Sequence, residues 1–266
     1  MKTLVIAEKP SVGRDIARVL KCGKNNQGAL EGDKYVVTWA LGHLVTLADP
    51  EAYDSKYKTW EMKDLPMLPE KFQLVVIKQT GKQYQTVKNH LYRKDISDVV
   101  IATDAGREGE LVARWILAKA GSHKPVKRLW ISSMEDSAIR EGFANLRPGA
   151  DYDGLRDAAL CRAKADWLVG INATRLFSVL YHRTLNIGRV MSPTLALIVQ
   201  REAEIDTFKP VPFYTVTLEL PGFTVSGERM ADKAAAQQLK TACQGAAGPG
   251  EKSGAQKQIR EAARPL

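Results

Sequence analysis

Short apolar runs and helical patterns alternate along the first 148 residues, and this alternation restricts the fold more than any other feature of the sequence. The apolar runs suit strands buried on both faces of a sheet. Predicted strands cover residues 3–7, 34–40, 73–77, 98–102 and 127–131, and predicted helices cover residues 11–20, 82–92, 107–120 and 135–145. This alternation is typical of an α/β domain with a mostly parallel sheet flanked by helices. We expect the domain to span residues 1–148, because the following Pro-Gly step interrupts the pattern.

An acidic run follows the buried strand predicted at residues 98–102. Asp104, Glu108 and Glu110 lie within seven residues, where the strand passes into a helix. Ligands bind at the carboxyl ends of strands in α/β sheets, and carboxylates suit a hard cation such as Mg²⁺. The alternative is structural, since acidic residues at a helix start are favoured by capping and by the helix dipole alone.

A second acidic residue, Glu8, directly follows the strand predicted at residues 3–7, and Lys9 comes next. If the two strands are neighbours in one parallel sheet, Glu8 and Asp104 converge. An acid and a lysine facing a metal-binding acidic cluster indicate a phosphoryl-transfer site. Ser11 is predicted to cap the helix of residues 11–20, and residues 133–136 (SMED) resemble a capping box for the helix that follows.

The composition favours a polyanionic partner. Thirty-nine Lys and Arg against 30 Asp and Glu give a net charge of +9 and a pI near 9.4, with nucleic acid as the leading candidate. Many basic proteins bind no polyanion, so charge supports this prediction without establishing it. No apolar run reaches the roughly 20 residues of a membrane span, and the chain begins with a predicted strand in place of a signal peptide. Three cysteines without CxxC spacing predict neither zinc nor disulfides and fit a reducing cytoplasm.

The pattern changes after residue 150. Residues 153–185 form one long helical pattern, and another helix is expected after Pro193. Pro210-Val211-Pro212 then interrupts the pattern. Residues 213–220 and 223–225 alternate like two paired strands, whereas residues 245–266 are rich in Gly, Ala, Lys and Gln and are expected to be weakly ordered.

Five motifs occur in order along the chain: residues 8–11 (EKPS), 39–44 (WALGHL), 102–110 (ATDAGREGE), 165–175 (ADWLVGINATR) and 188–195 (GRVMSPTL). Together they resemble the bacterial topoisomerase III family of type IA DNA topoisomerases. The resemblance covers nearly the whole chain. It implies a Toprim domain over residues 1–148, a helical single-strand DNA-binding domain over residues 151–206, and the start of a β-rich gate-arch domain over residues 210–266.

The resemblance implies a catalytic centre that uses Mg²⁺. Glu8 and Asp104 are the implied ligands, with Glu108 as a third acid that assists them. Glu8 is also implied to shuttle a proton, and Lys9 to stabilise charge at the scissile phosphate. Many relatives have Asp-x-Asp-x-Glu, but Gly106 stands at the second acidic position here. Because glycine has no ligating side chain, we expect a site for one metal ion.

The resemblance also implies a set of DNA contacts: Trp60, Arg162, Asp166, Trp167, Arg175, Asn186, Ile187, Gly188, Arg189, Val190 and Met191. An indole can stack on a base, and a guanidinium can grip phosphate. The two tryptophans rest mainly on the resemblance, because tryptophan is more often a core residue. The alternative for Arg162 and Asp166, four residues apart, is a surface ion pair. Relatives usually have Gln in place of Met191, which puts one hydrogen bond to DNA in doubt. His43 is expected to be a packed residue.

Type IA enzymes cleave DNA with a tyrosine in a Tyr-Pro-Arg-Thr-Asp stretch, and none of the eight tyrosines lies in one. Tyr181 precedes His-Arg-Thr, but it comes before the motif of residues 188–195 and lacks the following Asp. We therefore expect the amino-terminal part of an enzyme that breaks, passes and rejoins single DNA strands without ATP and acts on negatively supercoiled DNA.

By itself, the chain is expected to bind single-stranded DNA and Mg²⁺ without cleavage, in the cytoplasm and at the nucleoid of a bacterium. The alternatives are a non-catalytic single-stranded DNA-binding Toprim protein and a Toprim nuclease or primase-like protein.

Overall fold

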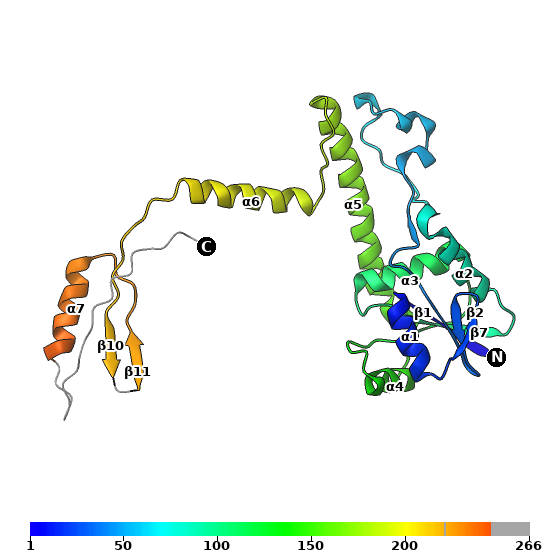
Figure 1. Cartoon of the computed structure of the whole chain (residues 1–266). Helices are drawn as coiled ribbons and strands as arrows, with labels where there is room; N and C mark the ends of the chain where they lie inside the picture. Colours follow the sequence, from blue (N-terminus) through cyan, green and yellow to red (C-terminus); the bar gives the residue numbers. More distant parts are fainter. Residues whose placement is uncertain (221, 246–266) are drawn as a thin grey trace. The chain divides into compact units, whose positions relative to one another are not determined.

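The computed structural model describes residues 1–220 and 222–245, and it divides into two compact units (Figure 1). The first unit spans Met1–Arg189, and the second begins at Val190. This boundary falls inside the range 151–206 that the sequence predicts as one helical domain. The predicted tail of residues 246–266 lies outside the described residues.

A seven-stranded sheet forms the centre of the first unit, in the order β2-β3-β4-β1-β7-β8-β9. Its middle strands β4 (Tyr35–Trp39), β1 (Lys2–Ala7), β7 (Ile96–Ala102) and β8 (Val126–Arg128) are parallel. The edge strands β2 (Lys24–Asn26), β3 (Ala29–Glu31) and β9 (Arg147–Pro148) pair antiparallel. The predicted α/β fold with a mostly parallel sheet is therefore confirmed, with antiparallel additions at both edges.

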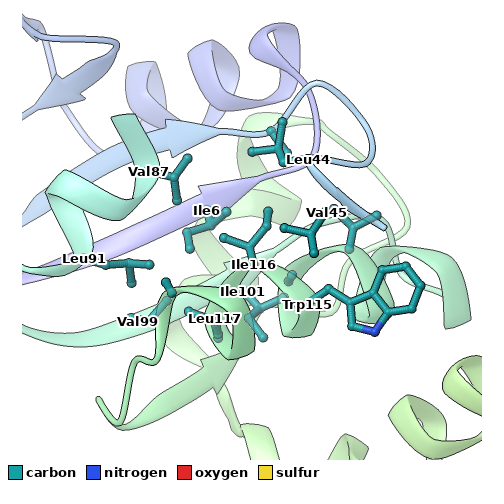
Figure 2. Packing of buried hydrophobic residues seen from close by; sticks show 14 of the residues in the cluster. Ile6, Leu44, Val45, Val87, Leu91, Val99, Ile101, Trp115, Ile116 and Leu117 are labelled. Atoms are coloured by element: carbon teal, nitrogen blue, oxygen red, sulfur yellow. The ribbon is translucent and has the colours of Figure 1, made fainter. Parts of the chain in front are cut away.

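Alternate strand residues point to opposite sides of this sheet, so both faces carry apolar side chains, and helices cover both of them. On one face, Leu4, Ile6 and Ile101 pack with residues of α2 (Gly81–Leu91) and α3 (Arg107–Ala120). On the other face, Val5 and Val100 pack with residues of α1 (Pro10–Val19) and α4 (Asp136–Ala144). Figure 2 shows the first of these clusters, in which strand and helix side chains interdigitate.

The predicted strand at residues 73–77 forms, but outside the main sheet. β6 (Leu74–Val76) pairs antiparallel with β5 (Val45–Leu47), which the sequence pattern did not reveal, in a separate two-stranded sheet. Three short 3₁₀ helices, η1 (Pro50–Ala52), η2 (Ser55–Lys58) and η3 (Met62–Asp64), lie between these strands, and η4 (Lys78–Thr80) precedes α2. η5 (Gly149–Tyr152) leads into the long helix α5 (Asp153–Leu180), which packs against α3.

Two predicted helix caps are wrong. Helix α1 begins at Pro10 with Lys9 as its N-cap, so Ser11 lies inside the first turn and caps nothing. A proline suits this first position, because its missing N–H has no partner in a helix anyway. Helix α4 begins at Asp136 without a side-chain cap. The Ser133 hydroxyl instead accepts a hydrogen bond from the Glu135 amide at 3.2 Å.

The second unit contains α6 (Met191–Asp206), the antiparallel pair β10 (Thr217–Leu220) and β11 (Phe223–Ser226), and α7 (Lys233–Gly245). The strand pair was predicted, although β10 begins at Thr217, later than expected, and Tyr214 forms an isolated bridge with Met230. Helix α7 was not predicted. No helix in residues 1–220 and 222–245 is long and apolar enough to cross a membrane.

Candidate active site

The two acidic residues that follow neighbouring strands meet at the carboxyl edge of the sheet. β1 and β7 are adjacent and parallel, with Ala7 level with Ala102. Glu8 and Asp104 therefore leave the sheet side by side, and a Glu8 carboxylate oxygen accepts a hydrogen bond from the Asp104 amide at 3.0 Å. The predicted convergence of these two residues is confirmed.

The loop that carries Asp104 is tightly wound. The buried hydroxyl of Thr103 donates to the Gly109 carbonyl at 2.7 Å, and the Gly106 amide donates to the Asp104 carbonyl at 2.9 Å. A Cβ atom on Gly109 would lie 2.2 Å from the Asp104 carbonyl oxygen, far inside van der Waals contact. Glycine at this position therefore allows the first turn of α3 to press against the acidic residue and to hold it at the edge.

A buried ion network supports this loop from below, and the sequence pattern did not reveal it. Glu110 and Arg128 are both 0% exposed, and Arg128 Nε donates to Glu110 at 2.9 Å. Arg114 Nε donates to the other Glu110 oxygen at 2.7 Å. The Arg128 guanidinium also donates to the carbonyls of Thr103 at 2.9 Å and Asp104 at 2.7 Å. Glu110, the last acidic residue of the run at 104–110, is therefore a structural residue.

The buried charges of Arg128 and Glu110 stabilise each other. Burial lowers the pKa of the Arg128 guanidinium, and the carboxylate of Glu110 opposes that shift. A buried arginine with an ionised partner and carbonyl acceptors is satisfied in its hydrogen bonds, as a buried charge must be. No sequence signal marks Arg128, because β8 reads Val-Lys-Arg, and in that strand Val126 is half-buried and Lys127 is exposed.

Glu108 lies at the head of a chain of ion pairs that runs along α5. One of its carboxylate oxygens lies 3.4 Å from Arg162 Nη1, and the other lies 3.9 Å from His43 Nε2. Arg162 also lies 3.8 Å from Asp166, which accepts a hydrogen bond from Arg189 Nε at 2.7 Å. The acidic residue predicted to assist the metal thus lies between Arg162 and the His43 ring. Four predicted site residues, Glu108, Arg162, Asp166 and Arg189, form one connected row.

His43 is not the packed residue that the sequence suggested. Its side chain is 39% exposed and lies beside Glu108, with its ring 5.8 Å from that of Trp115. The preceding Gly42 has φ +78°, and its amide donates to the Glu8 carbonyl at 3.3 Å. Glycine tolerates this left-handed backbone, which brings the 40–44 loop to the acidic edge.

The carboxylates of Glu8 and Asp104 suit a cation that keeps part of its water shell. Glu8 is half-buried, Asp104 is exposed, and both offer carboxylate oxygens at one edge. Nowhere in the described part of the chain do three or more His, Cys, Asp or Glu side chains gather into a ready-made metal cage. Mg²⁺ is commonly held by one or two carboxylates plus water and phosphate oxygens, so these two residues suit it better than they suit Ca²⁺ or Zn²⁺. The Lys9 side chain is exposed next to Glu8.

Arg175 and Trp60, two predicted DNA contacts, meet beside a pocket of about 550 Å³ that Asn186 and Ile187 also line. Arg175 is largely buried, donates to the Tyr57 carbonyl at 2.6 Å and places its guanidinium carbon 5.2 Å from the centre of the Trp60 ring. Burial lowers the pKa of this guanidinium. Arg175 therefore organises the pocket wall, while Trp60 stays partly exposed at its rim.

Trp167 is held within the protein. Its indole N–H donates to the Ala48 carbonyl at 2.9 Å, and its ring meets Tyr53 and Phe72 edge-on, with centroids 5.8 and 5.5 Å apart. These contacts tie α5 to the segment around β5 and β6. A stacked base on Trp167 stays a prediction, and the contacts of the ring in this structure are those of a packing residue.

The segment of residues 186–191 crosses the boundary between the two units. In the first unit, the Thr174 hydroxyl accepts a hydrogen bond from the Ile187 amide at 2.9 Å and so ties the loop to α5. Arg189 reaches Asp166, and this pairing raises its pKa. Val190 and Met191 belong to the second unit, where Met191 begins α6 and both side chains are exposed.

Comparison with known families assigns both parts of the chain. Residues 3–134 match the family described as Toprim domain, and residues 150–265 match the family described as DNA topoisomerase. Among curated proteins, DNA topoisomerase 3 of Bacillus licheniformis and that of Bacillus subtilis (strain 168) are each 60% identical to this chain over 225 residues. The matched region covers 85% of this chain and 31% of each relative, so the chain spans about a third of their length.

The fold has a solved counterpart. Full-length topoisomerase I from Thermotoga maritima matches with a TM-score of 0.56 and 23% identity over 89% of this chain and 37% of that chain. At this level of identity the likeness supports the fold, and the assignment to a family rests on the sequence matches.

Proposed function

Because the chain belongs to the type IA family of DNA topoisomerases, we propose that it binds Mg²⁺ and single-stranded DNA at the carboxyl edge of its sheet. It would do so as part of a topoisomerase III that breaks, passes and rejoins single DNA strands without ATP. The observation that carries this proposal is the direct hydrogen bond between the Glu8 carboxylate and the Asp104 amide. Negatively supercoiled DNA is the proposed substrate of the whole enzyme, at the nucleoid in the bacterial cytoplasm.

Each residue of the acidic edge has a proposed task. Glu8 and Asp104 hold Mg²⁺, which when bound supplies positive charge next to a DNA phosphate. Glu8 would also take or give a proton at the scissile oxygen. Lys9, exposed beside it, stabilises negative charge on the phosphate. Glu108 stays paired with Arg162 and His43 until DNA or metal competes for one of those contacts.

The row of ion pairs on α5 is the proposed path of the DNA backbone. Arg162 on α5 and Arg189 in the loop after α5 both pair with Asp166, so their guanidinium groups lie on either side of it. Phosphates are bidentate partners for arginine and compete with the exposed carboxylate. The sugars and bases further along the DNA strand would bind at the loop of residues 186–191 and in the pocket beside Trp60 and Arg175.

A salt titration tests DNA binding. Anisotropy of a fluorescein-labelled oligodeoxythymidine should show binding that weakens steeply with salt, because bound phosphates release counterions. Replacing one phosphate-binding arginine should lower the slope of log K against log salt by about one. Arg162→Gln should do this. Arg18→Gln, which removes a paired and exposed arginine on α1, should leave the slope unchanged. A salt-independent affinity of the wild type would contradict the proposal.

We propose further that this chain binds DNA without cutting it. The tyrosine most similar to the family's nucleophile, Tyr181, directly follows the last residue of α5 and stacks on Phe177 with 6.2 Å between ring centroids. Incubation with 3′-labelled single-stranded DNA and Mg²⁺, followed by denaturation, should yield no covalent protein–DNA adduct. An adduct that forms with wild-type chain and is lost in Tyr181→Phe would overturn this reading.

A further inference from the structure

Trp130 is a large exposed aromatic residue at the same sheet edge as the acidic pair. β8 ends at Arg128, and the Leu129 amide continues its ladder by donating to the Ile101 carbonyl at 2.9 Å. Trp130 therefore leaves the sheet beside the loop of Asp104, to which Arg128 is bonded. Its side chain is 42% exposed and so presents aromatic surface to solvent.

Two neighbouring side chains contact the indole ring. It stacks on Tyr152, with ring centroids 5.0 Å apart and an angle of 24° between the planes. The guanidinium carbon of Arg128 lies 5.1 Å from the centre of the indole ring, and that of Arg147 lies 5.5 Å from the centre of the Tyr152 ring. An exposed ring that is already ordered loses little conformational freedom when a ligand stacks on it.

The chemistry of the adjoining hollow indicates a flat, neutral ligand. Trp130 lines a pocket of about 330 Å³ with Ile131, Ser132, Ser133, Ala138, Glu141, Gly142 and Asn145. The serine hydroxyls and the asparagine amide can donate or accept hydrogen bonds, as the edge of a base requires. The Glu141 carboxylate disfavours a phosphate inside the hollow. A nucleobase satisfies these conditions, while its phosphates remain outside.

We propose that Trp130 is a stacking platform for one base of the single-stranded DNA that reaches the Glu8–Asp104 edge. This inference rests on the proposed function, because it assumes that the chain binds single-stranded DNA. It adds a contact that the five sequence motifs do not contain. It also places that contact on the loop between β8 and α4, away from α5.

Two oligonucleotides separate stacking from charge. One is oligodeoxythymidine, and the other has the same length and phosphates but carries abasic residues. Stacking on an aromatic side chain changes affinity by roughly 5- to 150-fold per base. Trp130→Ala should weaken binding of oligodeoxythymidine within this range and leave the slope of log K against log salt unchanged. It should leave binding of the abasic strand unchanged, and Trp130→Phe should retain most of the affinity for oligodeoxythymidine.

Three results would overturn the inference. Equal affinity of wild type and Trp130→Ala for oligodeoxythymidine would mean that no base stacks there. An equal loss on both oligonucleotides, shared by Trp130→Phe, would mean that the ring only supports the fold, which a lowered melting temperature would corroborate. If the wild type binds neither strand, the proposed function fails and this inference fails with it. The first two results leave the proposed function intact.

Discussion

Replacing Glu110 by Gln tests whether the buried ion network supports the acidic edge. The substitution keeps the size and shape of the side chain and removes its charge. Both Glu110 and Arg128 are fully buried, and the Glu110 carboxylate accepts hydrogen bonds from Arg128 and Arg114 at 2.9 and 2.7 Å. In the variant, the Arg128 guanidinium stays buried between backbone carbonyls without a negative partner.

The expected cost is large because the remaining charge cannot reach water. Breaking a buried ion pair by removing one partner costs about 3–5 kcal/mol. That is a substantial part of the roughly 5–15 kcal/mol by which a native domain is stable. In a domain of 150–250 residues, each kcal/mol lowers the melting temperature by about 2–4 °C, so the loss should be roughly 6–20 °C.

Urea unfolding at neutral pH, followed by far-ultraviolet circular dichroism, measures this cost. Asp157→Asn is the matched control, since it makes the same carboxylate-to-amide change in an exposed pair with Arg156 and should leave the midpoint unchanged. A loss below about 1 kcal/mol in Glu110→Gln would refute the reasoning, because exposed pairs already reach that value. Such a result would mean that the carboxylate does not stabilise Arg128 in the folded state.

Three further predictions concern other parts of the first unit. Gly109→Ala forces a methyl group against the Asp104 backbone and should cost about 1–3 kcal/mol in urea unfolding while weakening metal binding; an unchanged affinity for Mn²⁺ would contradict it. Trp167→Ala should destabilise the fold by about 2–3 kcal/mol, somewhat less than for a fully buried aromatic residue, whereas a loss of DNA affinity at unchanged stability would show that the ring contacts DNA. Hydrogen bonds from Arg93 hold the pKa of Glu31 well below its ordinary value of 4.5. Its stabilisation is therefore fully present above pH 4.5, declines below that pH, and is lost as the pH falls through the lowered pKa of the folded state. Glu31→Gln should therefore cost about 1.5–3 kcal/mol at pH 7 and less at pH 3, and an equal cost at both pH values would contradict the assignment.

Much of the first unit is predictable because its strands are buried on both faces. β1 and β7 each end in a continuous apolar run, residues 4–7 and 99–102, and the acidic residues after these runs mark where each strand ends. The convergence of Glu8 and Asp104 then follows from parallel pairing alone. Helix α3 was predicted with its observed bounds, since its apolar residues recur at helical spacing.

Other features depend on contacts between distant residues and leave no local pattern. The buried pair of Glu110 and Arg128 joins residues 18 apart in the sequence; the sequence marks Glu110 only as one acid of the run at 104–110 and gives no role to Arg128. β5 is three residues long and is formed by pairing with β6, so its sequence shows no period. Trp167 resembles a DNA contact by motif, but its environment comes from Ala48, 119 residues away. In these cases contacts between residues distant in the sequence determine the structure, and the local sequence does not reveal them.

Binding of Mn²⁺, a spectroscopic stand-in for Mg²⁺ at carboxylate sites, tests the central claim most directly. Electron paramagnetic resonance of free Mn²⁺ should lose intensity as wild-type chain is added, and Mg²⁺ should restore it. Asp104→Asn should abolish this loss, while Asp151→Asn, in an exposed pair with Arg147, should not. Equal binding of Mn²⁺ by wild type and Asp104→Asn would contradict a metal site at the Glu8–Asp104 edge.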